Sequence, residues 1–185
     1  ISTSFSKSEP GSTLKQFQIE GSSNSLTIRA SHPFVRSRGE NLNGYLGFTS
    51  RNSKTDLLNS NITTDRLRIL NIGAAYDFVD RYRGVNLISV DLAKGIDFMG
   101  ATGPGSANLS RADGRSDFTK LSGEILRLQQ LGLGLSFLTS FTWQYASNVL
   151  LSSEEFGLGG SQLVRAYDPS EITGMCGRLR CCLIY

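Results

Sequence analysis

The residues best suited to specific chemistry lie between positions 154 and 174, and their types favour ionic binding over catalysis. Three glycines within residues 157–160 allow the backbone to approach another surface closely. Arg165 follows, between two apolar neighbours. A guanidinium keeps its charge and binds carboxylates through paired hydrogen bonds, so a buried Arg165 requires an acidic or carbonyl-rich partner. The alternative is a solvated arginine in a glycine-rich turn.

The sequence gives little support to an enzymatic function. It contains no G-x-S-x-G motif, no phosphate-binding glycine loop and no regular spacing of metal ligands. Glu154 and Glu155 are adjacent and point to opposite faces when extended, which suits acid–base catalysis poorly. His32 has no triad-like partners, and the three cysteines within residues 176–182 form no C-x-x-C pair. We therefore predict a protein that is not an enzyme and needs no metal or cofactor.

Composition narrows the class of protein further. The chain has 185 residues, a net charge of +3 and 19% charged residues. Its basic residues are scattered, which argues against nucleic-acid binding. No segment reaches the ~18 consecutive apolar residues of a membrane helix, so a membrane protein with this sequence has to be a β-barrel. The chain begins at Ile1 without a signal peptide, and we interpret it as a fragment.

Alternating residue types predict short antiparallel strands. The clearest strand spans Leu133–Tyr145, where mostly large apolar residues alternate with small polar ones. Trp143 and Tyr145 at its end are typical of the aromatic girdle of an outer-membrane barrel. Helix remains an alternative for Glu124–Leu131, which is rich in helix formers. The other expected strands cover residues 1–7, 14–20, 26–31, 43–50, 68–78, 88–93 and 117–130.

The predicted connections alternate between short and long. Short turns are expected at Val79–Gly84 and Gln130–Gly132, and a tight turn at Gly21–Asn24. Long loops are expected at residues 51–65, 94–116 and 154–174. Outer-membrane barrels show this rhythm, with short periplasmic turns and long outer loops. A soluble β-sandwich that binds a partner also fits the strand pattern.

The segment from 154 to 174 resembles a known signature. Its pattern is similar to the Phe…Gly-Gly…Val-Arg-Gly-Tyr/Phe…Gly motif on the sixth outer loop of the two-partner secretion transporters, the TpsB (ShlB/FhaC/HecB) family. The family's glycine after the arginine is replaced by alanine in this chain. The matching residues are Phe156, Gly159, Gly160, Val164, Arg165, Ala166, Tyr167 and Gly174.

A second stretch carries the same resemblance. Residues 32–42 are similar to the Pro-Leu-x-Arg-Ser-Arg…Asn-Leu motif that TpsB proteins carry at a periplasmic turn between two strands. Proline removes a backbone donor and keeps the preceding residue out of the helical region, so a strand end is also the local prediction. The matching residues are Pro33, Arg36, Arg38 and Asn41.

The resemblance implies a fold and a function. Residues 1–185 would form part of an antiparallel transmembrane β-barrel, about nine of its roughly sixteen strands, without the upstream POTRA domains and the last strands. The parent would be a monomeric barrel in the lipid of the bacterial outer membrane. It would export a large TpsA-type exoprotein, a haemolysin or adhesin, without nucleotide hydrolysis. A related alternative is a barrel-assembly insertase, which shares the arginine loop.

Overall fold

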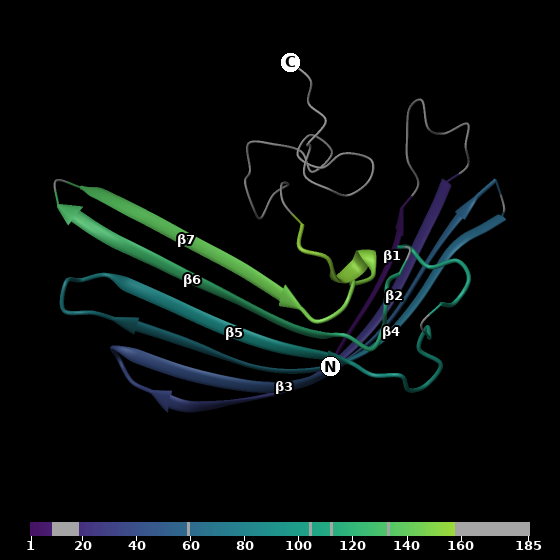
Figure 1. The fold of residues 1–185 in the computed structure, drawn as a ribbon. Coiled ribbons are helices and arrows are strands. Elements are labelled where there is room, and N and C mark those ends of the chain that lie inside the picture. The colour runs from purple at the N-terminus through teal and green to yellow at the C-terminus, as the bar shows by residue number, and fades with distance from the viewer. Residues whose placement is uncertain (9–18, 59, 104, 112, 133, 158–185) are drawn as a thin grey trace, which may run out of the picture. The chain divides into compact units, whose positions relative to one another are not determined.

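The computed structural model describes residues 1–8, 19–58, 60–103, 105–111, 113–132 and 134–157. Within this part, seven antiparallel strands form one sheet in sequence order (Figure 1). No helix among the described residues is long and apolar enough to cross a membrane. The predicted all-β class is therefore confirmed. The elements are β1 (Ser2–Ser8), β2 (Ile19–Arg36), β3 (Glu40–Leu57), β4 (Ser60–Val79), β5 (Val85–Gly95), β6 (Thr119–Gly132), β7 (Leu135–Ala146) and the 3-10 helix η2 (Ser152–Glu154).

Three strands are much longer than the sequence pattern indicates. The loop predicted at residues 51–65 is wrong, because β3 and β4 continue through it and pair up to Leu57 and Ser60. The turn predicted at Gly21–Asn24 is also wrong, since these residues belong to β2 and pair with β3. Strands of 18 to 20 residues exceed the roughly 9–11 that span a bilayer. The residues at 51–65 that extend β3 and β4 are mostly polar, so the apolar alternation that marks a strand is absent from them.

Hydroxyl side chains stabilise this extended region across the strands. The Ser23 and Ser53 hydroxyls lie 3.2 Å apart, and those of Thr27 and Thr49 lie 3.3 Å apart. Such Ser and Thr pairs stabilise neighbouring strands without any apolar residue. A serine- and threonine-rich stretch can therefore be a paired strand as readily as a loop.

The number of strands differs from our expectation. The described residues hold seven strands against about nine expected. The strand expected at 26–31 lies in β2, and so do residues 19 and 20 of the strand expected at 14–20, whose other residues lie outside the described ones. The last expected strand follows residue 174, outside the described residues. The helix alternative at Glu124–Leu131 is wrong, since β6 covers that segment.

Short turns join the strands at one end of the sheet. Residues 37–39 connect β2 to β3, residues 80–84 connect β4 to β5, and residues 133–134 connect β6 to β7 (Figure 1). The predicted short turn at 79–84 is thus confirmed to within one residue. The turn predicted at 130–132 exists but comes later, because these three residues belong to β6. The predicted loop at 94–116 is also confirmed, as residues 96–118 lead from β5 to β6 at the opposite end.

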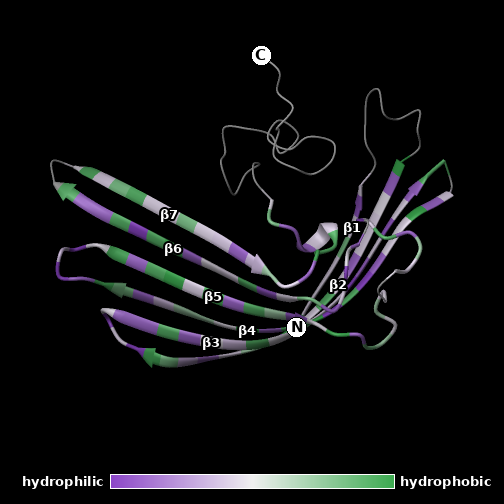
Figure 2. Cartoon of the chain, in the orientation of Figure 1, coloured by the Kyte–Doolittle hydropathy of each residue, from purple (hydrophilic) through white to green (hydrophobic). Residues whose placement is uncertain are grey.

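The two faces of the sheet differ in chemistry. Figure 2 shows hydrophobic and hydrophilic residues alternating along the strands. The register places Leu46 of β3, Ile72 of β4 and Leu92 of β5 side by side on one face. We call this the apolar face, and it also carries Ile28, Phe48, Leu70, Val90, Leu121, Ile125, Phe141 and Tyr145. The other face, the polar face, carries Arg29, Tyr45, Asn71, Asp91, Ser122, Glu124, Thr142 and Gln144.

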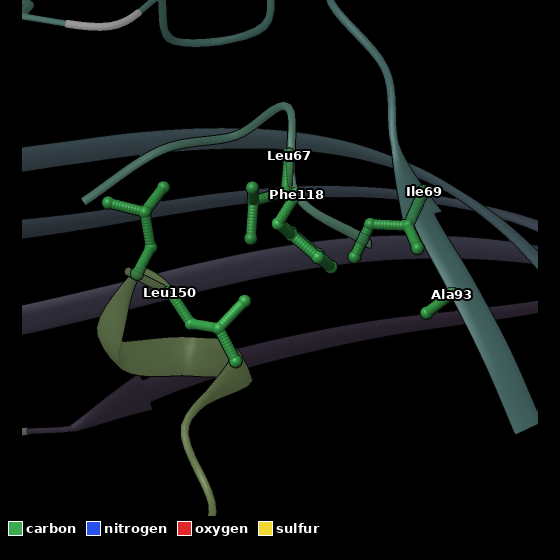
Figure 3. Packing of buried hydrophobic residues seen from close by; sticks show 6 residues of the cluster. Leu67, Ile69, Ala93, Phe118 and Leu150 are labelled. Atoms are coloured by element: carbon green, nitrogen blue, oxygen red, sulfur yellow. The ribbon is translucent and has the colours of Figure 1, made fainter. Parts of the chain in front are cut away.

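A small hydrophobic core covers one end of the polar face. Leu67 and Ile69 of β4 and Ala93 of β5 gather there around Phe118 (Figure 3). Leu150 and Leu151 complete the cluster. The long connection is fixed to β4 by backbone hydrogen bonds, from Ile96 N to Arg68 O at 2.8 Å and from Thr102 N to Arg66 O at 2.9 Å. The loop between β5 and β6 is therefore folded against the sheet.

Replacing Phe118 with alanine tests this core. Phe118 is 0% exposed, and emptying such a site costs about 3 kcal/mol or more. We expect Phe118→Ala to accelerate hydrogen exchange at the Ile96 and Thr102 amides in the full-length protein. Phe98→Ala is the matched control, because Phe98 lies in the same loop and is 60% exposed. Equal exchange in the two variants would show that Phe118 does not hold the loop.

Candidate functional site

The structure describes only the beginning of the glycine-rich segment at residues 154–174. The chain divides into two compact units, Ile1–Ser153 and Glu154–Tyr185. The second unit is described only to residue 157, so Phe156 is the one residue of the predicted loop motif within the described residues. Gly159, Gly160, Val164, Arg165, Ala166, Tyr167 and Gly174 lie outside them.

The predicted turn motif lies at the β2–β3 turn. Pro33 pairs with Asn43 just before the register between β2 and β3 shifts at residue 34. Ser37 closes the turn, since its backbone N–H donates to Glu40 O at 2.9 Å and its hydroxyl accepts from Glu40 N at 3.1 Å. The motif therefore contains a strand end, but β2 continues three residues beyond Pro33 to Arg36, later than the proline predicts.

The polar residues of this turn motif differ in their contacts. The Asn41 side chain donates to the Asp77 carboxylate of β4 at 2.7 Å, which links two neighbouring strands. Arg36 and Arg38 are exposed at the turn. Asn41 thus holds the strands together, while the arginines remain at the surface.

The polar face contains a cluster that the sequence does not identify. The Arg29 guanidinium lies 3.4 Å from the centre of the Tyr45 ring. The Tyr45 hydroxyl donates to the Asp91 carboxylate, which also accepts from Asn71 at 3.5 Å. Because these residues come from β2, β3, β4 and β5, only the strand register brings them together. A polar residue at every second position of each strand was the only available signal.

Glycine makes room for the central tyrosine. A Cβ atom at Gly73, directly across from Tyr45, would lie 2.6 to 2.7 Å from atoms of the tyrosine ring. The ring therefore lies flat over β4 and can reach Asp91 on the next strand. Beside it, a cleft of about 320 Å³ is lined by Arg29, Asp91 and Glu124, among others. The charges in this cleft suit contact with water or with a polar chain.

A sheet with one apolar and one polar face can separate lipid from water. The comparison with protein families is decisive. A family model described as "Haemolysin secretion/activation protein ShlB/FhaC/HecB" matches residues 1–179. The chain belongs to this family. The predicted resemblance is thereby confirmed, and ShlB/FhaC/HecB proteins are β-barrels of the bacterial outer membrane.

A solved structure agrees with the ShlB/FhaC/HecB assignment. CdiB from Escherichia coli is similar to this chain with a TM-score of 0.72 and 19% sequence identity. The similarity covers 82% of this chain and 28% of CdiB, and at this identity it supports the fold alone. No curated protein matches the chain. The predicted antiparallel transmembrane β-barrel is confirmed. In such a barrel the apolar face of the sheet meets lipid and the polar face lines the interior.

The Tyr45–Asp91 contact can be tested in the full-length ShlB/FhaC/HecB protein. Losing a hydrogen bond to a charged group costs about 1.5–3 kcal/mol, so Tyr45→Phe should lower the free energy of unfolding in lipid vesicles by roughly that amount. In an Asp91→Ala background the same change should have no effect. Tyr145→Phe is the control, because Tyr145 lies on the apolar face and is 69% exposed. An equal loss in both backgrounds would contradict the contact.

Proposed function

We propose that the full-length protein is an outer-membrane pore that exports one large exoprotein of the TpsA type in two-partner secretion. The family match over residues 1–179 carries this proposal. The chain spans 28% of the length of CdiB, so the activity is proposed for the whole protein. A haemolysin or adhesin is the proposed class of exoprotein.

The polar face supports transport of an unfolded chain. An extended polypeptide carries backbone donors and acceptors that need partners or water. The interior face offers Ser122, Thr142 and Gln144 as neutral hydrogen-bonding groups beside the charged cleft. Asp91 is already held by Tyr45 and Asn71, which lowers its tendency to bind a passing cation tightly. We propose that the exoprotein moves along this face without nucleotide hydrolysis.

Arg165 is the proposed anchor of the glycine-rich loop. The family resemblance implies that its guanidinium binds an acidic motif on a later barrel strand, beyond Tyr185. A buried arginine without such a partner would cost several kcal/mol, so the pair would fix the loop. Ala166 departs from the family's glycine, which makes it the residue of this motif that the resemblance does not explain.

The alternatives receive less support. The matching family is described by secretion and activation rather than by membrane insertion, which favours a secretion pore over a barrel-assembly insertase. A soluble β-sandwich would bury apolar residues between two sheets. This sheet instead leaves Leu46, Ile72 and Phe141 of its apolar face exposed.

Replacing Arg165 tests the proposed function. Breaking a buried charge pair costs about 3–5 kcal/mol, so Arg165→Ala should reduce exoprotein in the culture medium at least about tenfold. The full-length variant should still fractionate with outer membranes and shift its mobility on heating in detergent. Arg66→Ala is the control, because Arg66 is an exposed arginine of β4. Unchanged secretion by a correctly inserted Arg165→Ala barrel would refute the anchor.

A further inference from the structure

The apolar face contains a groove. Gly44 of β3, Ala74 of β4 and Val90 of β5 lie side by side in one row across the sheet. The next row holds the larger Leu46, Ile72 and Leu92, which leaves a depression of about 620 Å³ over the small residues. Phe34 forms one wall, and its ring lies so close to Gly44 that a Cβ atom there would be 2.5 Å away. The groove is almost wholly apolar and lies on the face that meets lipid.

Four arginines lie at the short-turn end of the same strands. Arg36 ends β2, Arg38 lies in the β2–β3 turn, and Arg81 and Arg83 lie in the β4–β5 turn. The two turns are neighbours, because Val79 N donates to Gly39 O at 2.9 Å. All four arginines are exposed, and none forms an ion pair among the residues that the structure describes.

The acidic residues at this end are already engaged. The Glu40 carboxylate accepts from the Tyr76 hydroxyl at 2.8 Å. Asp80 accepts from the backbone N–H groups of Tyr82 and Gly84 at 2.9 Å each and pairs with Arg127 at 2.7 Å. The bond from Gly84, with help from Arg127, holds the pKa of Asp80 below its ordinary value, so it stays ionised and paired. This end keeps a net positive charge, because five arginines (Arg36, Arg38, Arg81, Arg83 and Arg127) outnumber the three carboxylates of Glu40, Asp77 and Asp80.

The spacing between the groove and the turns matches a lipid. Gly44 lies five positions after Gly39, a distance of about 17 Å along an extended strand. The hydrocarbon of one bilayer leaflet is roughly 15 Å deep. A phospholipid with its phosphate at the turns would therefore place an acyl chain at the depth of the groove.

We propose that the outer surface of β2–β5 binds one anionic phospholipid, with its acyl chain in the groove around Gly44 and Ala74 and its headgroup on Arg36, Arg38, Arg81 and Arg83. Charge complementarity selects the anionic headgroup, because guanidinium groups bind phosphate through paired hydrogen bonds and a headgroup without a cation of its own keeps a net negative charge. The groove supplies apolar contact that a smooth barrel surface lacks. This inference rests on the outer-membrane location and is independent of the proposed secretion.

Native mass spectrometry of the purified full-length protein tests the proposal with two probes, phosphatidylglycerol and phosphatidylcholine. Arg36→Gln, Arg38→Gln, Arg81→Gln and Arg83→Gln combined should weaken phosphatidylglycerol binding by about fivefold for each arginine removed. Phosphatidylcholine, whose choline offsets the phosphate charge, should be weakened much less. Ala74→Phe, which fills the groove, should weaken both lipids. The control pair Lys54→Gln and Arg66→Gln removes two exposed cations from the opposite end of the sheet and should change neither.

Other outcomes would overturn the proposal. Full retention of phosphatidylglycerol by the four-arginine variant, or an equal loss in the control, would exclude the headgroup site. A dimer that dissociates in Ala74→Phe, with lipid binding unchanged, would show that a second copy covers the groove. The double variant Arg81→Gln and Arg83→Gln provides the same test if the four-arginine barrel fails to insert. Each variant is first checked for heat-dependent mobility in detergent.

Discussion

The pairing of each strand with its neighbour in the chain is the constraint on which the rest of this structure depends. Inside a bilayer no water is present to bind an open N–H or C=O group, and each unpaired group costs several kcal/mol. The sheet meets this demand in the described residues with an unbroken antiparallel order from β1 to β7. Once that ladder is fixed, side chains can only alternate between its two faces. A shift of one residue would turn Ile72 inward and Asn71 toward lipid, so register and membrane orientation are set together.

The two faces then take on separate tasks. The polar face can hold charged side chains because water and cross-strand hydrogen bonds satisfy them. Asp91, for example, accepts hydrogen bonds from Tyr45 and Asn71. At one end the same face carries the core around Phe118, which folds the long β5–β6 connection against the sheet. The apolar face needs no such partners because lipid covers it. Its small residues Gly44 and Ala74 matter for a different reason, since they create a groove on a surface otherwise filled by large side chains.

Much of the fold could be predicted from the sequence, but the contacts between strands could not. Alternation identified β7, and the turn at residues 80–84 follows directly from its flanking strands. Residues 51–65 form paired strands despite their polar composition, because backbone pairing and Ser or Thr contacts such as that at Ser53 suffice to hold them. The Arg29–Tyr45–Asp91 cluster depends on the register of four strands, which no local pattern contains. The motif within residues 32–42 located the turn between β2 and β3, whereas the place of Arg165 stays a prediction outside the described residues.

Residues 71 and 72, adjacent in β4, are expected to face water and lipid respectively. Single cysteines at Asn71, Ile72, Phe141 and Thr142 of the full-length protein, in a background without native cysteines, can carry a fluorescent label in lipid vesicles. We expect nitroxide-labelled lipid to quench the label at 72 and 141, and aqueous iodide to quench it at 71 and 142. Equal quenching of neighbouring positions by either reagent would contradict a two-faced wall between lipid and the barrel interior.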